Sequence, residues 1–121
     1  MQITTVTRNQ IDIAVLSADV PLFTDTNAAL DVMATVQYET GCTRMAIPKA
    51  LIAEEFFRLS SGLAGEILQK FINYRVKIAI IGDFSGYTSK PLKDFMYESN
   101  NGRDIFFVAT EHDALERLSK A

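Results

Sequence analysis

Apolar residues recur along the chain with two spacings, and these spacings predict an alternation of strands and helices. Residues 3–7 and 11–17 are rich in β-branched side chains, and a polar turn, Arg8-Asn9-Gln10, separates them. In the second segment Ile11, Ile13 and Val15 alternate with Asp12 and Ala14, which is typical of a half-buried strand. The chain is therefore expected to open with a β-hairpin.

Helical spacing follows the hairpin. A first helix is predicted after the capping candidates Asp25-Thr26-Asn27, with the apolar stripe Ala29, Val32, Met33 and Val36, and Gly41 ends it. A second begins at Ser60-Ser61 and carries Leu63, Ile67 and Phe71, with Ala64, Leu68 and Ile72 beside them. Because this second stripe is so broad, we expect that helix to be mostly buried.

Two further helices are predicted nearer the C-terminus. One carries Leu92, Phe95 and Met96, and Pro91 is acceptable in its first turn, where an N–H would lack a partner. It ends at Asn100-Asn101-Gly102. The last carries Ala114, Leu115 and Leu118, and Thr110 with Asp113 three residues later resembles a capping box at its start.

Short continuous apolar runs lie between the helices. Residues 78–81 and 105–109 are expected to be strands covered on both faces, which favours parallel pairing, and residues 45–47 form a shorter run that Pro48 stops. Residues 50–57 indicate a short helix or helical turn. The element order is then ββαβ(α)αβαβα. It predicts one α/β domain over residues 1–121, with a mixed sheet and helices packed on it.

Composition narrows the classes of function. Hydrophobic residues make up 48% of the chain and charged residues 22%, as in an ordinary globular protein, and the net charge is −3. Such a charge gives no general attraction to nucleic acid or to an anionic membrane. We find no signal peptide pattern and no apolar stretch of membrane-spanning length. A cytoplasmic protein with a protein or small-molecule partner is expected.

Few residues are available for metal or nucleophile chemistry. Cys42 is the only cysteine, so no internal disulfide can form, and it is expected to be a semi-buried structural thiol. His112 is the only histidine, and it is expected to be solvated in the first turn of the last helix. Neither the P-loop pattern nor the dinucleotide-binding glycine pattern occurs. No catalytic residue, metal or cofactor is predicted.

Two groups of side chains remain candidates for a binding site. Ser60 and Ser61 start a helix, where backbone N–H groups and the helix dipole would stabilise an added phosphate, although they also serve as plain N-cap residues. The loop from Asp83 to Ser89 leaves the carboxyl end of a predicted parallel strand, where open α/β sheets place ligands, and it contains Ser85 and Tyr87. Its hydroxyls could equally cap the turn and the next helix.

Three neighbouring features are interpreted as structural. Glu54 and Glu55 point about 100° apart on a helix and are expected on a solvated face. Phe56 and Phe57 are expected in the core. In Gly62-Leu63-Ala64-Gly65 the small residues are expected to allow close packing of the helix on the sheet.

The segment Leu59-Ser60-Ser61-Gly62-Leu63 resembles the Asp-Ser-Ser-Gly-Leu motif of STAS domains in anti-anti-sigma factors, with Leu59 in place of the aspartate. The elements that follow also occur in the STAS order. The resemblance implies a STAS-like fold with an extra short helix before the central helix. It also implies a regulatory module that binds a protein partner, and it makes Ser60 the counterpart of the serine that is phosphorylated in that family.

Over its full length the chain resembles a bacterial family of unknown function, domain-of-unknown-function family 4180. The resemblance rests on Tyr38-Glu39-Thr40-Gly41-Cys42, on residues 62–71 and on Gly82-Asp83-Phe84-Ser85. It implies no activity.

Three hypotheses follow. The first is a non-catalytic regulatory module that binds a protein through the surface around Ser60 and Ser61. The second is a small-molecule-binding protein or small enzyme that uses Glu54, Glu55, Asp83, Ser85, Tyr87 and Ser89 at the strand ends. The third is a homodimer formed through the exposed edge of the opening hairpin.

Overall fold

The structure is a computed structural model that describes residues 1–121. It has five strands and four α-helices, and three short 3₁₀ turns precede the second helix. The strands are β1 (Gln2–Arg8), β2 (Ile11–Ser17), β3 (Arg44–Pro48), β4 (Lys77–Ile81) and β5 (Ile105–Val108). The helices are α1 (Thr26–Thr40), α2 (Leu63–Asn73), α3 (Lys90–Asn100) and α4 (Glu111–Lys120).

The five strands form one mixed sheet in the order β1-β2-β3-β4-β5. β1 and β2 are antiparallel and form the predicted hairpin, whose turn residues Asn9 and Gln10 have φ of 51° and 66°. Positive φ at both central residues is typical of the two-residue turn that matches the twist of a hairpin. β2 to β5 are all parallel, as the apolar runs predict.

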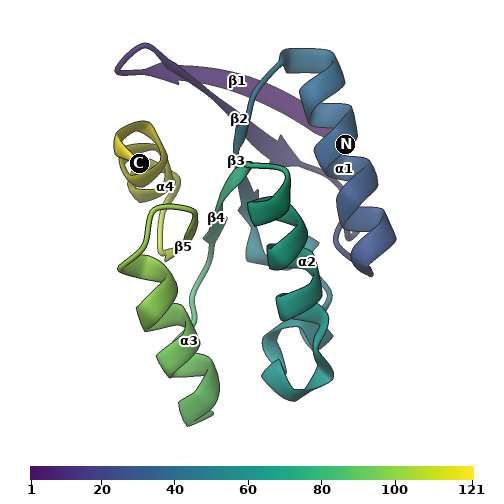
Figure 1. The fold of residues 1–121 in the computed structure, drawn as a ribbon, viewed down its shortest axis with the longest axis vertical. Coiled ribbons are helices and arrows are strands. Elements are labelled where there is room, and N and C mark those ends of the chain that lie inside the picture. The colour runs from purple at the N-terminus through teal and green to yellow at the C-terminus, as the bar shows by residue number, and fades with distance from the viewer.

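Helices cover both faces of the sheet. α1, α2 and α3 share one apolar cluster with side chains from one face, including Met45, Ile78 and Phe107. α4 covers the other face through Ala114, Leu115 and Leu118. In Figure 1 the strands lie between α4 on one side and α1 and α2 on the other. Right-handed crossovers between successive parallel strands explain why the three connecting helices lie on the same face.

The starts of α1 and α4 follow the predicted capping chemistry, whereas α2 begins at Leu63 after Gly62 and not at Ser60-Ser61. Asp25 accepts a hydrogen bond from the backbone N–H of Ala28, and Gly41 ends α1 with φ of 71°. Thr110 accepts from the N–H of Asp113 at the start of α4. Pro91 lies in the first turn of α3, as predicted. None of the helices is long and apolar enough to cross a membrane.

The structure refines one prediction and corrects two. The short helix or helical turn predicted over residues 50–57 is divided into two 3₁₀ turns, Lys49–Leu51 and Glu54–Phe57, and a third follows at Leu59–Ser61. The chain is held extended at Ile52, which bridges Phe23, and backbone N–H groups of residues 22 and 23 donate to the carbonyl of Leu51. These contacts interrupt a helix. Ile72 on α2 is 45% exposed, so the buried stripe is narrower than expected. Gly65 is exposed with open space beside its Cα, and therefore it does not serve close packing.

Candidate functional site

A groove lies beside the carboxyl ends of β3 and β4. It has a volume of about 800 Å³ and is open to solvent. One wall is the segment of 3₁₀ turns that follows β3, and the other is the loop that joins β4 to α3. The nine residues that line it are Glu54, Glu55, Phe57, Arg58, Leu59, Ser60, Tyr87, Ser89 and Pro91.

The first wall places apolar side chains inward and polar ones outward. Phe56 and Phe57 are 1% and 4% exposed and belong to the main core, as predicted. Glu54 and Glu55 precede them in the same 3₁₀ turn and remain exposed. Gly62 ends this wall with φ of 81°, a conformation that side chains rarely adopt, and α2 begins at the next residue.

The second wall is fixed by aromatic packing and by a local turn. Tyr87 stacks on Phe57, with ring centroids 5.2 Å apart and an interplanar angle of 21°. Phe84 packs edge-on against Phe107, with centroids 5.6 Å apart. Asp83 Oδ1 accepts a 2.9 Å hydrogen bond from the backbone N–H of Ser85, which closes the turn after β4.

A polar contact joins the two walls. The Tyr87 hydroxyl donates a 2.7 Å hydrogen bond to Glu54 Oε1. Lys49 Nζ lies 3.8 Å from the other oxygen of the same carboxylate, and it lies 4.9 Å from the centroid of the Tyr87 ring and 5.3 Å from that of Phe57. The ammonium therefore covers two stacked rings and neutralises one carboxylate.

The surroundings of Lys49, Tyr87 and Asp83 shift the pKa of each side chain further from pH 7. The adjacent Tyr87 side chain, followed by the charges of Glu54 and Asp83, raises the pKa of Lys49. Partial burial raises the pKa of Tyr87. Hydrogen bonding by Ser85, with Lys49 adding a smaller effect, lowers the pKa of Asp83. At neutral pH Lys49 is thus an ammonium, Tyr87 a neutral phenol and Asp83 a carboxylate, and of the three only Tyr87 lines the groove.

The two predicted serines have different environments. Ser60 lines the groove, is exposed and makes no hydrogen bond through its hydroxyl within the protein. The Ser61 hydroxyl donates to the carbonyl of Glu55 at 2.8 Å and accepts from the N–H of Leu63 at 3.2 Å. Ser61 therefore helps to start α2, although Gly62 holds the N-cap position itself. Both hydroxyls lie on the surface.

The structure brings residues from both predicted candidate groups to one groove. Glu54, Glu55, Ser60, Tyr87 and Ser89 all line it, although the sequence placed them in separate hypotheses. Ser61, Asp83 and Ser85 lie outside the lining. Glu54 and Glu55 are solvated, as predicted. Their carboxylates have different partners: Glu55 pairs with Arg58 at 3.4 Å, and Glu54 accepts a hydrogen bond from Tyr87.

Sequence reasoning missed two cations, Lys49 and Arg58. A signal for Lys49 was present, because it directly follows the buried run 45–47 and Pro48, and hence it lies at the carboxyl end of a parallel strand. Gly82, at the end of β4, supports this placement, since a Cβ there would lie 2.7 Å from the Cβ of Lys49. The methylene groups of Lys49 pass next to Gly82, which has no side chain that would block them.

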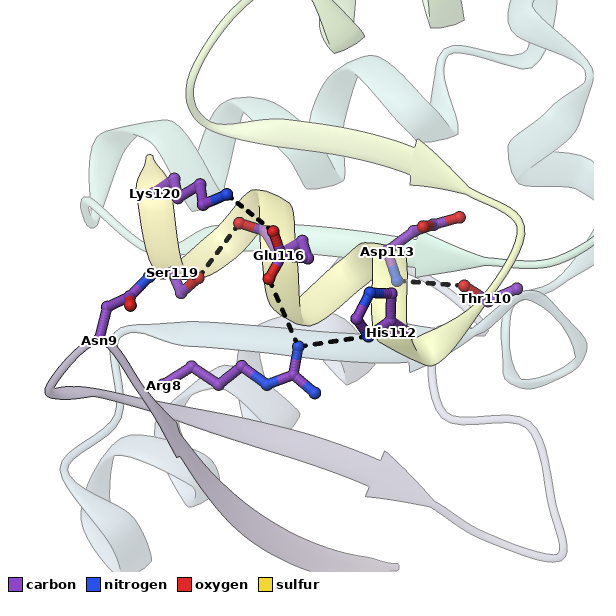
Figure 2. Close-up of polar contacts among 8 residues, drawn as sticks. All are labelled: Arg8, Asn9, Thr110, His112, Asp113, Glu116, Ser119 and Lys120. Atoms are coloured by element: carbon purple, nitrogen blue, oxygen red, sulfur yellow. Dashed lines mark hydrogen bonds and ion pairs between the residues drawn. The ribbon is translucent and has the colours of Figure 1, made fainter.

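The only histidine lies on the other face of the sheet. Figure 2 shows His112 in the first turn of α4, with its Nδ1 3.4 Å from the guanidinium of Arg8, which also lies 3.7 Å from Glu116. His112 is exposed, as predicted. Cys42 is 3% exposed and thus more deeply buried than the semi-buried thiol expected. No three histidine, cysteine, aspartate or glutamate side chains are placed to hold a metal ion together.

Comparison with known proteins gives one match. The family model described as "Domain of unknown function (DUF4180)" matches residues 8–118, which includes both walls of the groove. No curated protein and no solved structure matches the chain.

Proposed function

The chain belongs to the DUF4180 family, and from this premise we propose that it is a non-catalytic regulatory module that binds a segment of a protein partner in the groove. The observation that carries the proposal is the lining of the groove. Phe57, Leu59 and Pro91 give it an apolar part, and Glu54, Glu55 and Arg58 give it a charged part. Such a mixture of apolar and polar side chains is typical of protein interfaces.

The charges of the lining indicate the chemistry of the partner. The side chains of Glu54 and Glu55 are 74% and 56% exposed, and Arg58, which is 67% exposed, pairs with Glu55. Two carboxylates and one guanidinium leave the lining with one excess negative charge, which Glu54 presents to solvent. An extended segment with an apolar side chain beside a lysine or arginine complements this surface.

The ionisation states favour binding over catalysis. A general base or an amine nucleophile works best when its pKa lies near the working pH. Lys49 and Tyr87 are shifted upward and Asp83 downward, so each group is held more firmly in its ordinary state. These shifts suit fixed hydrogen-bond donors and charges.

Ser60 is the candidate for regulation of this groove, in the manner of a STAS module. Transfer of a phosphoryl group from ATP to Ser60 Oγ by a protein kinase would release ADP and the hydroxyl proton. It would leave about two negative charges on the groove wall. The Ser60 hydroxyl is free and exposed, whereas the Ser61 hydroxyl already makes two hydrogen bonds. The phosphate would add to the negative charge of Glu54 and Glu55 in the same groove, and we therefore expect it to strengthen binding of a segment that carries a lysine or arginine.

Site-specific photocrosslinking in the native cell tests the proposal. A benzophenone amino acid replaces Ser60 on the groove, and as a control it replaces Tyr38, which is 92% exposed on α1. We expect a discrete crosslinked protein from position 60 but not from position 38. Glu55→Lys should weaken this product, and Ser60→Asp, which adds a negative charge, should strengthen partner capture in a pull-down. Equal products from positions 60 and 38, or none from position 60, would reject the groove as the binding surface.

The position and size of the groove also favour a second candidate, binding of a small molecule. The groove lies at the carboxyl ends of parallel strands, and about 800 Å³ is within the usual range of ligand sites. In a thermal-shift screen of metabolites, a compound that binds the groove would raise the melting temperature of the wild type. Tyr87→Phe or Glu54→Gln would reduce that rise. A screen without any such compound counts against this candidate.

A further inference from the structure

The two edges of the sheet differ in how their backbone groups are satisfied. At the β5 edge the side chain of Asn100 takes the place of a neighbouring strand. The N–H of Phe107 donates to Asn100 Oδ1 at 2.7 Å, and Asn100 Nδ2 donates to the carbonyl of Phe107 at 3.1 Å. β5 is also only four residues long. A short, side-chain-capped edge offers little to a second sheet.

The β1 edge has no such cap. β1 is seven residues long and forms the other end of the sheet (Figure 1). In an antiparallel pair every second residue turns its N–H and C=O away from the partner strand. The pair Arg8↔Ile11 closes the two-residue turn and is hydrogen-bonded, so the residues that alternate with it and face outward are Thr7, Thr5 and Ile3. No backbone hydrogen bond outside the β1–β2 ladder reaches these three residues, and the one side-chain bond among them, from the Thr7 hydroxyl to Asp12, stays within the hairpin.

The residues of this edge favour strand pairing. Ile3-Thr4-Thr5-Val6-Thr7 is a run of five β-branched residues without proline, lysine or a carboxylate. Monomeric proteins usually protect an edge of this length with a charge, a proline or a bulge. The only charge on β1 is Arg8, at its end, and it is turned toward Glu116 and His112 on α4 (Figure 2).

Contacts within the single chain already fix the position of the β1–β2 hairpin. Besides the Arg8 contacts, Asn9 Nδ2 donates to the Ser119 hydroxyl at 3.3 Å, so the turn is tied to α4 (Figure 2). Val6 packs against the apolar cluster under α4, and Ile3 packs against the cluster on the opposite face. A strand fixed in this way loses little conformational freedom when it pairs.

We infer that β1 is a self-association edge, at which two copies of the chain pair β1 with β1 in antiparallel register about a twofold axis at Thr5. Such an axis places Ile3 opposite Thr7, Thr4 opposite Val6 and Gln2 opposite Arg8. β-branched residues then face one another along the strand, and the two Arg8 side chains lie at opposite ends of the pair. The edge is thus complementary to itself, as a twofold interface requires. This argument does not depend on the proposed groove.

Light scattering coupled to size exclusion, at micromolar to millimolar concentrations, tests the inference. We expect the wild type to have twice the mass of the chain. Thr5→Lys should give the monomer mass, because it places two like charges at the axis. Thr5→Pro should do the same, because it removes an outward N–H and leaves the β1–β2 ladder intact. Tyr97→Lys adds the same charge on exposed α3 and should remain dimeric.

Hydrogen exchange identifies the surface independently. The amides of Ile3, Thr5 and Thr7 should be protected in the wild type and exchange rapidly in Thr5→Lys, while those of Thr4 and Val6 stay protected in both. A monomeric wild type overturns the inference, and so does a dimer that both Thr5 variants retain. Glu55→Lys should leave the mass unchanged, which separates this edge from the groove.

Discussion

The Tyr87 hydroxyl and the Glu54 carboxylate form a 2.7 Å hydrogen bond across 33 residues of sequence. This bond connects the two walls of the groove at a point where their backbones are otherwise separate. Lys49 lies against the same carboxylate and over the same tyrosine ring, so the three side chains form one unit. We expect changes to any one of them to alter the other two.

Tyr87→Phe removes this hydrogen bond and keeps the aromatic stack. Because the bond is exposed, we expect the free energy of unfolding to fall by only about 0.5–1 kcal/mol. Denaturant titration measures this change. Tyr97→Phe is the matched control, since Tyr97 is 70% exposed and makes no side-chain hydrogen bond. Equal stabilities of the two variants would show that the Tyr87–Glu54 bond contributes nothing to folding.

Alkaline pH should weaken the fold through the same unit. The pKa values of Lys49 and Tyr87 are raised in the folded protein, so the unfolded chain loses these protons first. Their contribution is complete below the ordinary pKa values of 10.5 for lysine and 10.0 for tyrosine. It is lost as the pH rises through the folded values.

Denaturant titrations from neutral pH to above pH 10.5 measure this loss. Lys49→Met and Tyr87→Phe should each show a shallower decline in stability than the wild type. The raised pKa of Lys90, which Asp94 causes, is common to all three proteins and cancels in the comparison. The assignment fails if all three decline in parallel.

Gly82→Ala should displace Lys49. The new Cβ would lie 2.7 Å from the lysine Cβ and 3.0 Å from its Cδ, so the stem of the side chain must move away. We expect a loss of about 1–3 kcal/mol of unfolding free energy, as for other overpacked sites. In Gly86→Ala the added methyl meets nothing within 4 Å, and that variant should be as stable as the wild type or slightly more. Similar losses in both variants would point to the loop backbone instead.

Ser61→Ala and Ser60→Ala should separate structural from binding roles. Ser61→Ala removes a donor to the Glu55 carbonyl and a cap on the Leu63 N–H, and we expect it to cost about 1 kcal/mol. Ser60→Ala breaks no hydrogen bond and should change stability by less than about 0.5 kcal/mol. Thermal unfolding of both proteins measures the difference. The reverse order would mean that the two hydroxyls exchange roles in solution.

Asn100→Asp should destabilise the protein by removing one of the two hydrogen bonds that cap the β5 edge. The carboxylate can still accept from the N–H of Phe107, but it cannot donate to the Phe107 carbonyl and repels it instead. We expect a loss of about 1–3 kcal/mol, because a part-buried carbonyl is left unpaired. Asn101→Asp, at the neighbouring exposed position, is the control and should be close to neutral. Urea denaturation compares the two, and equal effects would contradict a capping role for Asn100.

The element order was accessible from the sequence because it depends on local patterns. Covered strands produce continuous apolar runs such as 78–81, and helices produce stripes with caps such as Thr110 and Asp113. These signals lie within a few residues of one another, where steric preferences and hydrogen bonding act directly. The parallel pairing followed from the same runs.

The 3₁₀ turns were not accessible in this way. Apolar residues at 51, 52, 56 and 57 fit a helical turn when they are considered alone. The bridge between Phe23 and Ile52 prevents a continuous helix, and that contact spans the whole of α1. Contacts between segments far apart in sequence leave no periodic signal, and therefore pattern analysis cannot detect them.

The candidate site shows the same division. The sequence by itself determined which side chains could take part, because Ser60 and the loop around Tyr87 are marked by a helix start and a strand end. Only the tertiary structure decided that they share a groove and that Lys49 covers the stacked rings beside it. The reason is the parallel sheet. Its register sets the ends of β3 and β4 side by side, and so it joins two loops that the chain separates by an entire helix.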